Sequence, residues 1–145
     1  MHSQILAPVV ALVAWTMAMM LWMYATRFPA MRRKGISLKG RVGGRGAALD
    51  GVVEDQVQWK AHNYNHLMEQ PTLFYAIAIV LALQGGGNIW INVWLAWGYV
   101  GFRILHSLIQ ATTNVVRWRF LAFTLASICL IGLIVHAGAR VLHDL

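Results

Sequence analysis

Long apolar stretches alternate with short polar segments along this chain. Four stretches reach, or nearly reach, the roughly 20 residues that a helix needs to cross the hydrocarbon core of a bilayer. They lie at about 5–26, 54–83, 89–112 and 120–142. The pattern predicts an all-α integral membrane four-helix bundle, a single domain over residues 1–145 without a separate soluble core.

The second stretch is unusual because its first half is polar. Pro71 leaves thirteen apolar-leaning residues before the glycine-rich turn at 84–88, which is too few to cross a membrane alone. The helix must therefore begin near Glu54 and carry its polar half into the membrane. Because proline removes a backbone donor, we expect a bend at Pro71 that neighbouring helices accommodate.

The three connections differ in charge. The first, about 27–53, is rich in glycine and holds, with its flank at Lys60, eight Lys or Arg residues; the second, 84–88, holds none; the third holds Arg117 and Arg119. By the positive-inside rule the first and third connections face the cytoplasm and both termini face the other side. The arginines of the first connection also suit contact with anionic lipid headgroups.

Composition agrees with a membrane protein and narrows the range of functions. Of the 145 residues, 59% are hydrophobic and 12% charged, and the mean hydropathy is +0.57, outside the range of soluble domains. The formal net charge of +7 comes from cations that flank apolar stretches, so we expect no nucleic-acid partner. The single cysteine, Cys129, excludes an intrachain disulfide.

Ionisable side chains of the second and third stretches fall at one depth. Glu69 lies fourteen residues before Leu83, and Arg103 lies fourteen residues after Ile89. At 1.5 Å per residue, each is about 21 Å along its helix from the turn at 84–88. The two opposite charges are therefore expected at the same level of the membrane.

The same count places His66 and Asn65 level with His106 and Ser107. Helical spacing then gathers two polar stripes: His62, Asn65 or His66, and Glu69 on the second helix, with Arg103, His106 and Gln110 on the third. Ionisable residues inside a membrane are costly and usually pair or line a polar cavity. The layer predicts either a functional site or a structural ion pair between Glu69 and Arg103 that fixes helix packing.

On these residues the chain resembles the MAPEG family, membrane-associated proteins in eicosanoid and glutathione metabolism, and its prokaryotic members in particular. The resemblance rests on the block His-Asn-Tyr-Asn-His-Leu-Met-Glu-Gln-Pro-Thr-Leu-Phe at 62–74, on Arg-Ile-Leu-His-Ser at 103–107, and on four helices with a long basic first connection. It covers nearly the whole chain. It implies a homotrimer in the bacterial inner membrane, with glutathione bound as co-substrate near the cytoplasmic face between neighbouring subunits.

The resemblance also implies roles for individual residues. Glu69 matches the second-helix glutamate, and Arg119 best matches the arginine held responsible for activating the glutathione thiol, because a nearby cation favours the nucleophilic thiolate. Either Arg32 or Arg33 is expected to supply the first-helix arginine. The implied glutathione-binding set is Arg32, Arg33, His62, Asn65, His66, Glu69, Arg103, His106, Gln110 and Arg117, with Arg119 as the catalytic residue.

The chain departs from the family pattern on its second and third helices. Asn65 and His66 occupy positions of an arginine and an asparagine, His62 stands where many members have another arginine, and Gln110 stands where tyrosine is common. Fixed positive charge is thus removed from one wall of a pocket whose ligand carries two carboxylates.

Three functions fit these residues. The first is glutathione conjugation to a hydrophobic electrophile, or reduction of a lipid hydroperoxide, with the apolar substrate entering from the bilayer. The second is a non-catalytic membrane protein that binds lipids or assists a partner, which the missing second-helix cations favour. The third is a metal site, because His62, His66, Glu69 and His106 are ligand types that suit zinc or iron.

Overall fold

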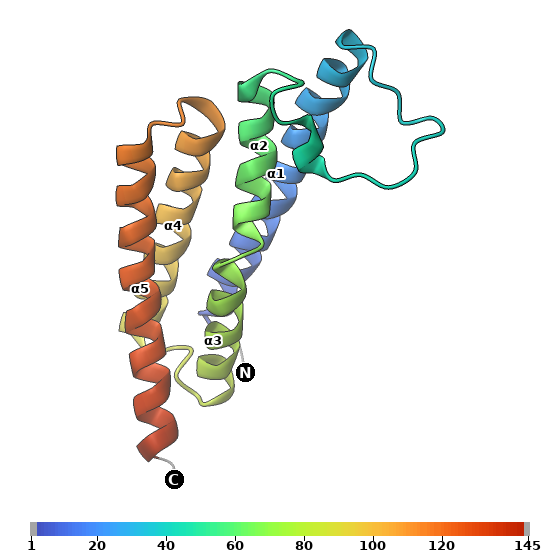
Figure 1. The fold of residues 1–145 in the computed structure, drawn as a ribbon. Helices are drawn as coiled ribbons and strands as arrows, with labels where there is room; N and C mark the ends of the chain where they lie inside the picture. Colours follow the sequence, from blue (N-terminus) through green and yellow to red (C-terminus); the bar gives the residue numbers. More distant parts are fainter. Residues whose placement is uncertain (1–2, 144–145) are drawn as a thin grey trace.

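The computed structural model describes residues 3–143, which form α-helices and one short 3-10 turn, with no β-strand among them. In chain order the elements are α1 (Leu6–Arg33), η1 (Gly46–Leu49), α2 (Asp55–Leu67), α3 (Pro71–Leu83), α4 (Trp90–Thr112) and α5 (Val116–His143). Because α2 and α3 follow one another along a single column, the chain forms a bundle of four columns (Figure 1).

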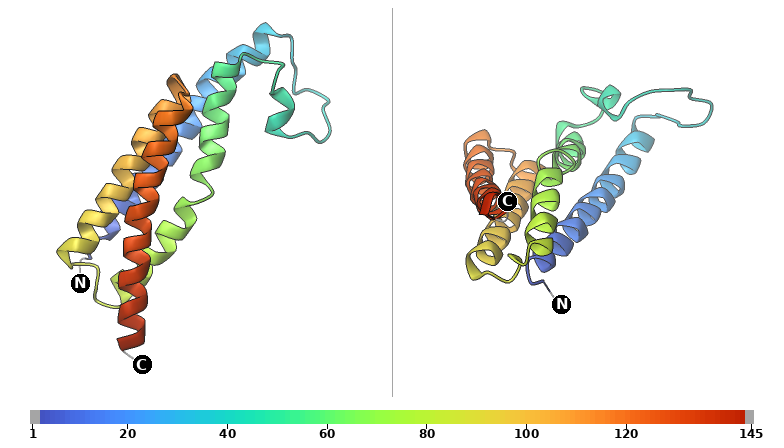
Figure 2. Two further views of the ribbon diagram at one scale, coloured as in Figure 1. Left: turned by 60° about the vertical axis from the view of Figure 1, so that its left-hand side comes forward. Right: turned by 90° about the horizontal axis from the view of Figure 1, so that it is seen from below.

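Three columns, namely α1, α2 with α3, and α5, are long and apolar enough to cross a membrane. The fourth, α4, runs beside α5 (Figures 1 and 2) and has 23 residues, about 34 Å at 1.5 Å per residue, which also exceeds the roughly 30 Å hydrocarbon core. Its buried polar side chains are Asn92, Arg103, His106, Ser107 and Gln110. The protein is therefore an all-α integral membrane bundle.

The second column is not one continuous helix, as the sequence suggested, but two. Residues 68–70 form a turn that belongs to neither helix and interrupts the helical hydrogen bonding between α2 and α3. Pro71 has no N–H to donate to the Leu67 carbonyl, so the helix ends there and restarts with proline in its first turn, where the missing donor matters least. The Thr72 hydroxyl donates to the Glu69 carbonyl at 2.7 Å and helps close the irregular turn.

The first helix extends beyond the expected end near residue 26, as far as Arg33. Pro29 lies inside it without ending it, and the basic side chains of the last turn complement the partial negative charge of a helix C-terminus. Likewise, α5 begins at Val116 and takes in basic residues that the sequence assigned to the third connection. The connections at this end are thus shorter than predicted.

Tight turns and a small core hold the columns together. Asn114, the one non-glycine residue in the described part of the chain with a positive φ (52°), ends α4 and donates its N–H to the Ile109 carbonyl at 2.7 Å. Between the columns, the buried rings of Phe74 and Tyr99 stack with centroids 4.4 Å apart. A second apolar cluster, Ala30, Met31, Leu49 and Val53, fastens η1 and the first connection to α1.

Candidate functional site

The predicted polar layer is present at the break between α2 and α3, and Arg103 is at its centre. This side chain is fully buried. It donates from one guanidinium nitrogen to the His66 carbonyl at 3.0 Å, and its other terminal nitrogen lies 3.4 Å from Nε2 of the His66 ring. The His66 carbonyl has lost its regular helical donor at the break, so Arg103 stabilises the irregular turn from the neighbouring helix.

Histidines continue the layer toward α5. The His66 and His106 rings lie 4.9 Å apart, and His106 Nδ1 donates to the Arg119 carbonyl at 2.9 Å. The other ring nitrogen of His106 lies 3.1 Å from Oε1 of Gln110, one turn along α4. Because carbonyl oxygens only accept, the Arg119 contact fixes a proton on Nδ1.

Amide and hydroxyl side chains complete the layer. Asn63 and Ser107 exchange two hydrogen bonds of 2.8 and 3.0 Å, and Gln70 donates to the Ser127 hydroxyl at 2.9 Å. Buried polar groups in a membrane need such partners. The layer therefore joins the broken column to α4 and α5.

The expected ion pair between Glu69 and Arg103 is not among the salt bridges of the described residues. Glu69 instead contacts His66 Nδ1 at 2.8 Å, with 68% of its side chain exposed. The depth of Glu69 was predicted from a continuous helix, and the break at 68–70 turns this residue outward. Arg103 takes the backbone carbonyl in its place.

A cleft of about 420 Å³ with both apolar and polar lining opens nearer the basic end of the bundle, the end that carries the first connection. It lies between α1, α2 and the segment 45–47, and its size falls in the range of small-molecule sites, about 300–1,000 Å³. The residues that line it are Met23, Arg27, Arg45, Gly46, Ala47, Gln58, Ala61, His62, Tyr64 and Asn65.

Arg27 is the cation of α1 in this cleft. One terminal nitrogen donates to the Gly46 carbonyl at 2.7 Å and to Oε1 of Gln58 at 2.9 Å. The other terminal nitrogen has only the Met23 sulfur, at 3.9 Å, and the buried Nε has no partner. Arg27 thus keeps one terminal nitrogen that contacts no oxygen and that an anionic ligand can use.

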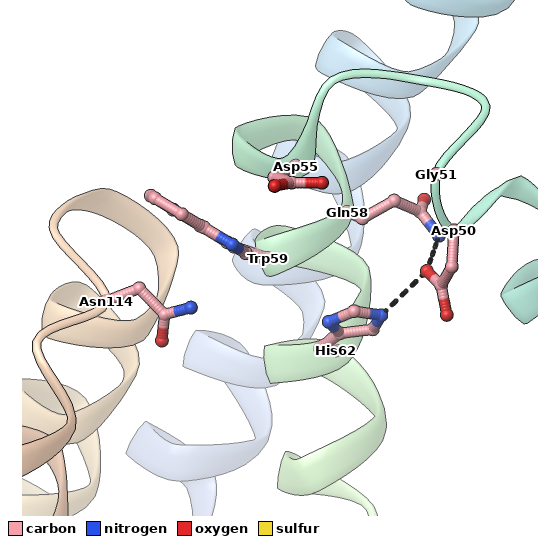
Figure 3. A pocket seen from close by; sticks show the side chains of 7 residues that line it. All are labelled: Asp50, Gly51, Asp55, Gln58, Trp59, His62 and Asn114. Atoms are coloured by element: carbon pink, nitrogen blue, oxygen red, sulfur yellow. Dashed lines mark hydrogen bonds and ion pairs between the residues drawn. The ribbon is translucent and has the colours of Figure 1, made fainter.

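A tether beside the cleft holds the first connection against α2. His62 Nε2 lies 3.0 Å from Oδ1 of Asp50, and Gln58 donates to the same carboxylate (Figure 3). Hydrogen bonds from Gln58 and His62 hold the pKa of Asp50 below its ordinary value. Asp50, Gln58 and His62 also line a smaller hollow, separate from the cleft, which Trp59 of α2 and Asn114 after α4 border (Figure 3).

The sequence-predicted residues fall into separate places. His62 and Asn65 line the cleft, while His66, Arg103, His106 and Gln110 belong to the inner layer. Arg32 and Arg33 are exposed at the end of α1, and Arg33 lies 3.6 Å from Glu54. Arg117 lies over the Trp118 ring, and Arg119 donates to Asn114 at 2.6 Å.

Sequence reasoning missed Arg27, Arg45 and Gln58. Arg27 was assigned to the first connection because α1 was expected to end just before it. The i, i+4 spacing from Met23 was the available signal, since it continues the buried face of the helix into the basic segment.

The metal-site hypothesis gains no support from this geometry. Among residues 3–143 no group of three or more His, Cys, Asp or Glu side chains is arranged to hold a metal ion. His62 is engaged with Asp50, and His66 with Glu69. The four side chains expected to form one site are thus divided between two.

The four-column architecture and the polar layer agree with the comparison of the sequence with known families. The sequence model of the MAPEG family matches residues 5–139. The chain belongs to the MAPEG family. No curated protein and no solved structure matches it. MAPEG proteins are generally associated with glutathione. In this MAPEG protein the cleft between α1 and α2 has the size of a small-molecule site.

Proposed function

We propose that this protein binds glutathione and uses its thiol on hydrophobic substrates, either conjugating the sulfur to an electrophile or reducing a lipid hydroperoxide to the alcohol and water while two glutathione molecules are oxidised to the disulfide. The observation that supports this most is Arg27, which lines a cleft of ligand size and has a terminal nitrogen whose one contact is the Met23 sulfur at 3.9 Å. Glutathione is a tripeptide thiol with two carboxylates, and arginine binds carboxylates through paired hydrogen bonds.

The cleft compensates for the cations that α2 lacks. Arg27 from α1 and Arg45 from the first connection supply positive charge, and His62 and Asn65 add polar groups from α2. The side chain of Arg45 has no hydrogen bond or ion pair within the described residues. A carboxylate bound at Arg27 uses the terminal nitrogen that contacts only the Met23 sulfur, while Arg45 adds positive charge from the edge of the cleft.

Arg119 is the proposed thiol-activating residue, but it does not line this cleft in its own chain. It lies at the start of α5, on the other side of α2 from Arg27 (Figure 1). We propose that the homotrimer unites the two, with Arg119 of one subunit facing the cleft of the next. There the cation favours the thiolate, which attacks an electrophilic carbon of a substrate from the bilayer; the carbon–sulfur bond forms as a leaving group departs with its electron pair, or as an activated double bond opens and is then protonated.

Equilibrium dialysis of the full-length protein in detergent micelles tests this function. Saturable binding of glutathione at millimolar concentration or below is expected. Arg27→Ala should weaken it tenfold or more, since a charge-assisted hydrogen bond contributes about 1.5–3 kcal/mol. Lys34→Ala, an equal change of charge at the exposed end of the same helix, should leave binding nearly unchanged.

Absence of saturable binding at millimolar glutathione would contradict the proposal. Equal losses in the two variants would place the ligand elsewhere. Binding that is intact without any turnover of hydrophobic electrophiles or hydroperoxides would favour the non-catalytic alternative instead. Size-exclusion profiles and helical circular dichroism of each variant show that its assembly is preserved.

A further inference from the structure

A second hollow lies on the other side of the first connection from the cleft. It measures about 300 Å³ and runs between the last turns of α1 and the segment 38–49. Tyr24, Phe28 and Leu38 give it an apolar wall, and Arg41 and Arg45 stand at its margin. The groove shares Arg27, Arg45 and Gly46 with the cleft, but Tyr24, Phe28, Leu38 and Arg41 belong to the groove and not to the cleft.

The apolar wall is open to the surroundings. The exposed fractions are 41% for Tyr24, 47% for Phe28 and 62% for Leu38, and the two aromatic rings stack with centroids 5.4 Å apart. Exposed apolar side chains gathered in one groove indicate a binding surface rather than chance exposure. An alkyl chain is the complementary shape for a narrow groove of this kind.

The cations at the groove are without acidic partners. Of the nearby acids, Asp50 is bound by Gln58 and His62, and Glu54 lies 3.6 Å from Arg33. Within the described residues, neither Arg41 nor Arg45 makes a side-chain hydrogen bond or ion pair. Two unpaired guanidinium groups suit a phosphate, whose oxygens match their planar donors.

The position of the groove along α1 matches the headgroup region of a bilayer. The 28 residues of α1 extend about 42 Å, against roughly 30 Å of hydrocarbon core and 40–45 Å with the headgroups included. The last turns of α1, which hold Tyr24 and Phe28, therefore lie near the boundary between acyl chains and headgroups. Aromatic residues are typical of that level.

We propose that this groove binds one anionic phospholipid of the surrounding bilayer. Its phosphate lies between Arg41 and Arg45, and an acyl chain lies along Tyr24, Phe28 and Leu38. The bound lipid holds the otherwise glycine-rich first connection against α1.

Native mass spectrometry of the full-length protein tests this site. The protein in detergent micelles is titrated with phosphatidylglycerol or with phosphatidylcholine of the same acyl chains. Phosphatidylglycerol should bind about fivefold tighter or more, and Arg41→Gln should reduce this preference about fivefold. Lys39→Gln removes the same charge two residues away, outside the groove, and should preserve it.

A second pair of variants tests the apolar half. Leu38→Ala should weaken binding of both lipids, whereas Val42→Ala, on the same connection and outside the groove, should not. Equal effects of Arg41→Gln and Lys39→Gln would show diffuse attraction to the basic connection and overturn the proposal. Displacement of phosphatidylglycerol by excess inorganic phosphate would also overturn it, because the site would then bind a free anion.

Discussion

Two arginines of the bundle have opposite surroundings. Arg103 is fully enclosed and donates to the backbone at the break in the second column. Arg27 lies at a cleft, and one of its terminal nitrogens contacts only the Met23 sulfur. If Arg103 bound a ligand, the His66 carbonyl would lose its hydrogen bond from α4. We therefore assign Arg103 to holding the turn at 68–70 in place and Arg27 to ligand binding.

Removing the hydrogen-bond donors of Arg103 should destabilise the turn at 68–70. In Arg103→Met the His66 carbonyl loses its 3.0 Å bond from α4, while most of the side-chain volume remains. Hydrogen exchange in peptides that cover 66–70 should become about tenfold faster, as expected for the loss of one buried hydrogen bond. Arg117→Met, on the exposed start of α5, should leave these peptides unchanged; equal acceleration in both would contradict the role of Arg103.

The carboxyl of Asp50 should titrate below its ordinary pKa of 3.8, because Gln58 and His62 donate to its charged form. A lowered folded-state pKa means that the tether is present at neutral pH and is lost only as pH falls through the shifted value. Carbon NMR of labelled aspartates in micelles measures this pKa, and His62→Ala should raise it. A titration of Asp50 above 3.8 in the unsubstituted protein would contradict the tether.

At the scale of elements, the sequence predicts the columns well and their ends less well. Apolar length identified four columns, and Pro71 marked where the second one is interrupted. The depth count also placed His66 level with His106, because it depends only on helical rise, but Ser107, expected level with Asn65, pairs with Asn63 instead. The ends of α1 and α5 were missed because basic residues within a helix look like a connection in the sequence.

The outward position of Glu69 was beyond prediction for a related reason. A proline signals a bend, but the number of residues that leave the helix sets the rotation of one helical segment relative to the next. Here three residues, 68–70, do so, and the predicted partner of Arg103 is turned toward the exterior. The cleft at Arg27 depends on how the first connection folds back on α2, which no local pattern encodes.

We expect Gln70 to make the main hydrogen bonds between the turn at 68–70 and the neighbouring helices α4 and α5. Its amide donates to Ser127 on α5 and accepts at 3.4 Å from the Tyr99 hydroxyl on α4. Gln70→Ala should lower the free energy of unfolding by about 1 kcal/mol, seen as a lower Tm in detergent. Gln56→Ala, at an exposed position of α2, should have no such effect; unchanged stability in Gln70→Ala would mean that these contacts are dispensable.

At the scale of the whole molecule, the proposed machinery is divided between two faces of one chain. Arg27, His62 and Asn65 line the cleft between α1 and α2. Arg119 lies in the first turn of α5 and does not line this cleft. The proposed homotrimer explains this division, because a neighbouring subunit can present its α5 to the cleft. The exposed apolar faces of the columns leave room for such packing within the membrane.

Subunit complementation tests the shared site most directly. Arg27→Ala and Arg119→Ala chains, each carrying a different affinity tag, are produced alone and together, and assemblies that hold both tags are purified. Each variant alone should show little glutathione-dependent turnover of a hydrophobic electrophile. Mixed assemblies should regain a substantial fraction of the unsubstituted activity, because some sites then combine an intact Arg27 from one chain with an intact Arg119 from the next. Mixed assemblies as inactive as either variant alone would contradict a site built from two subunits.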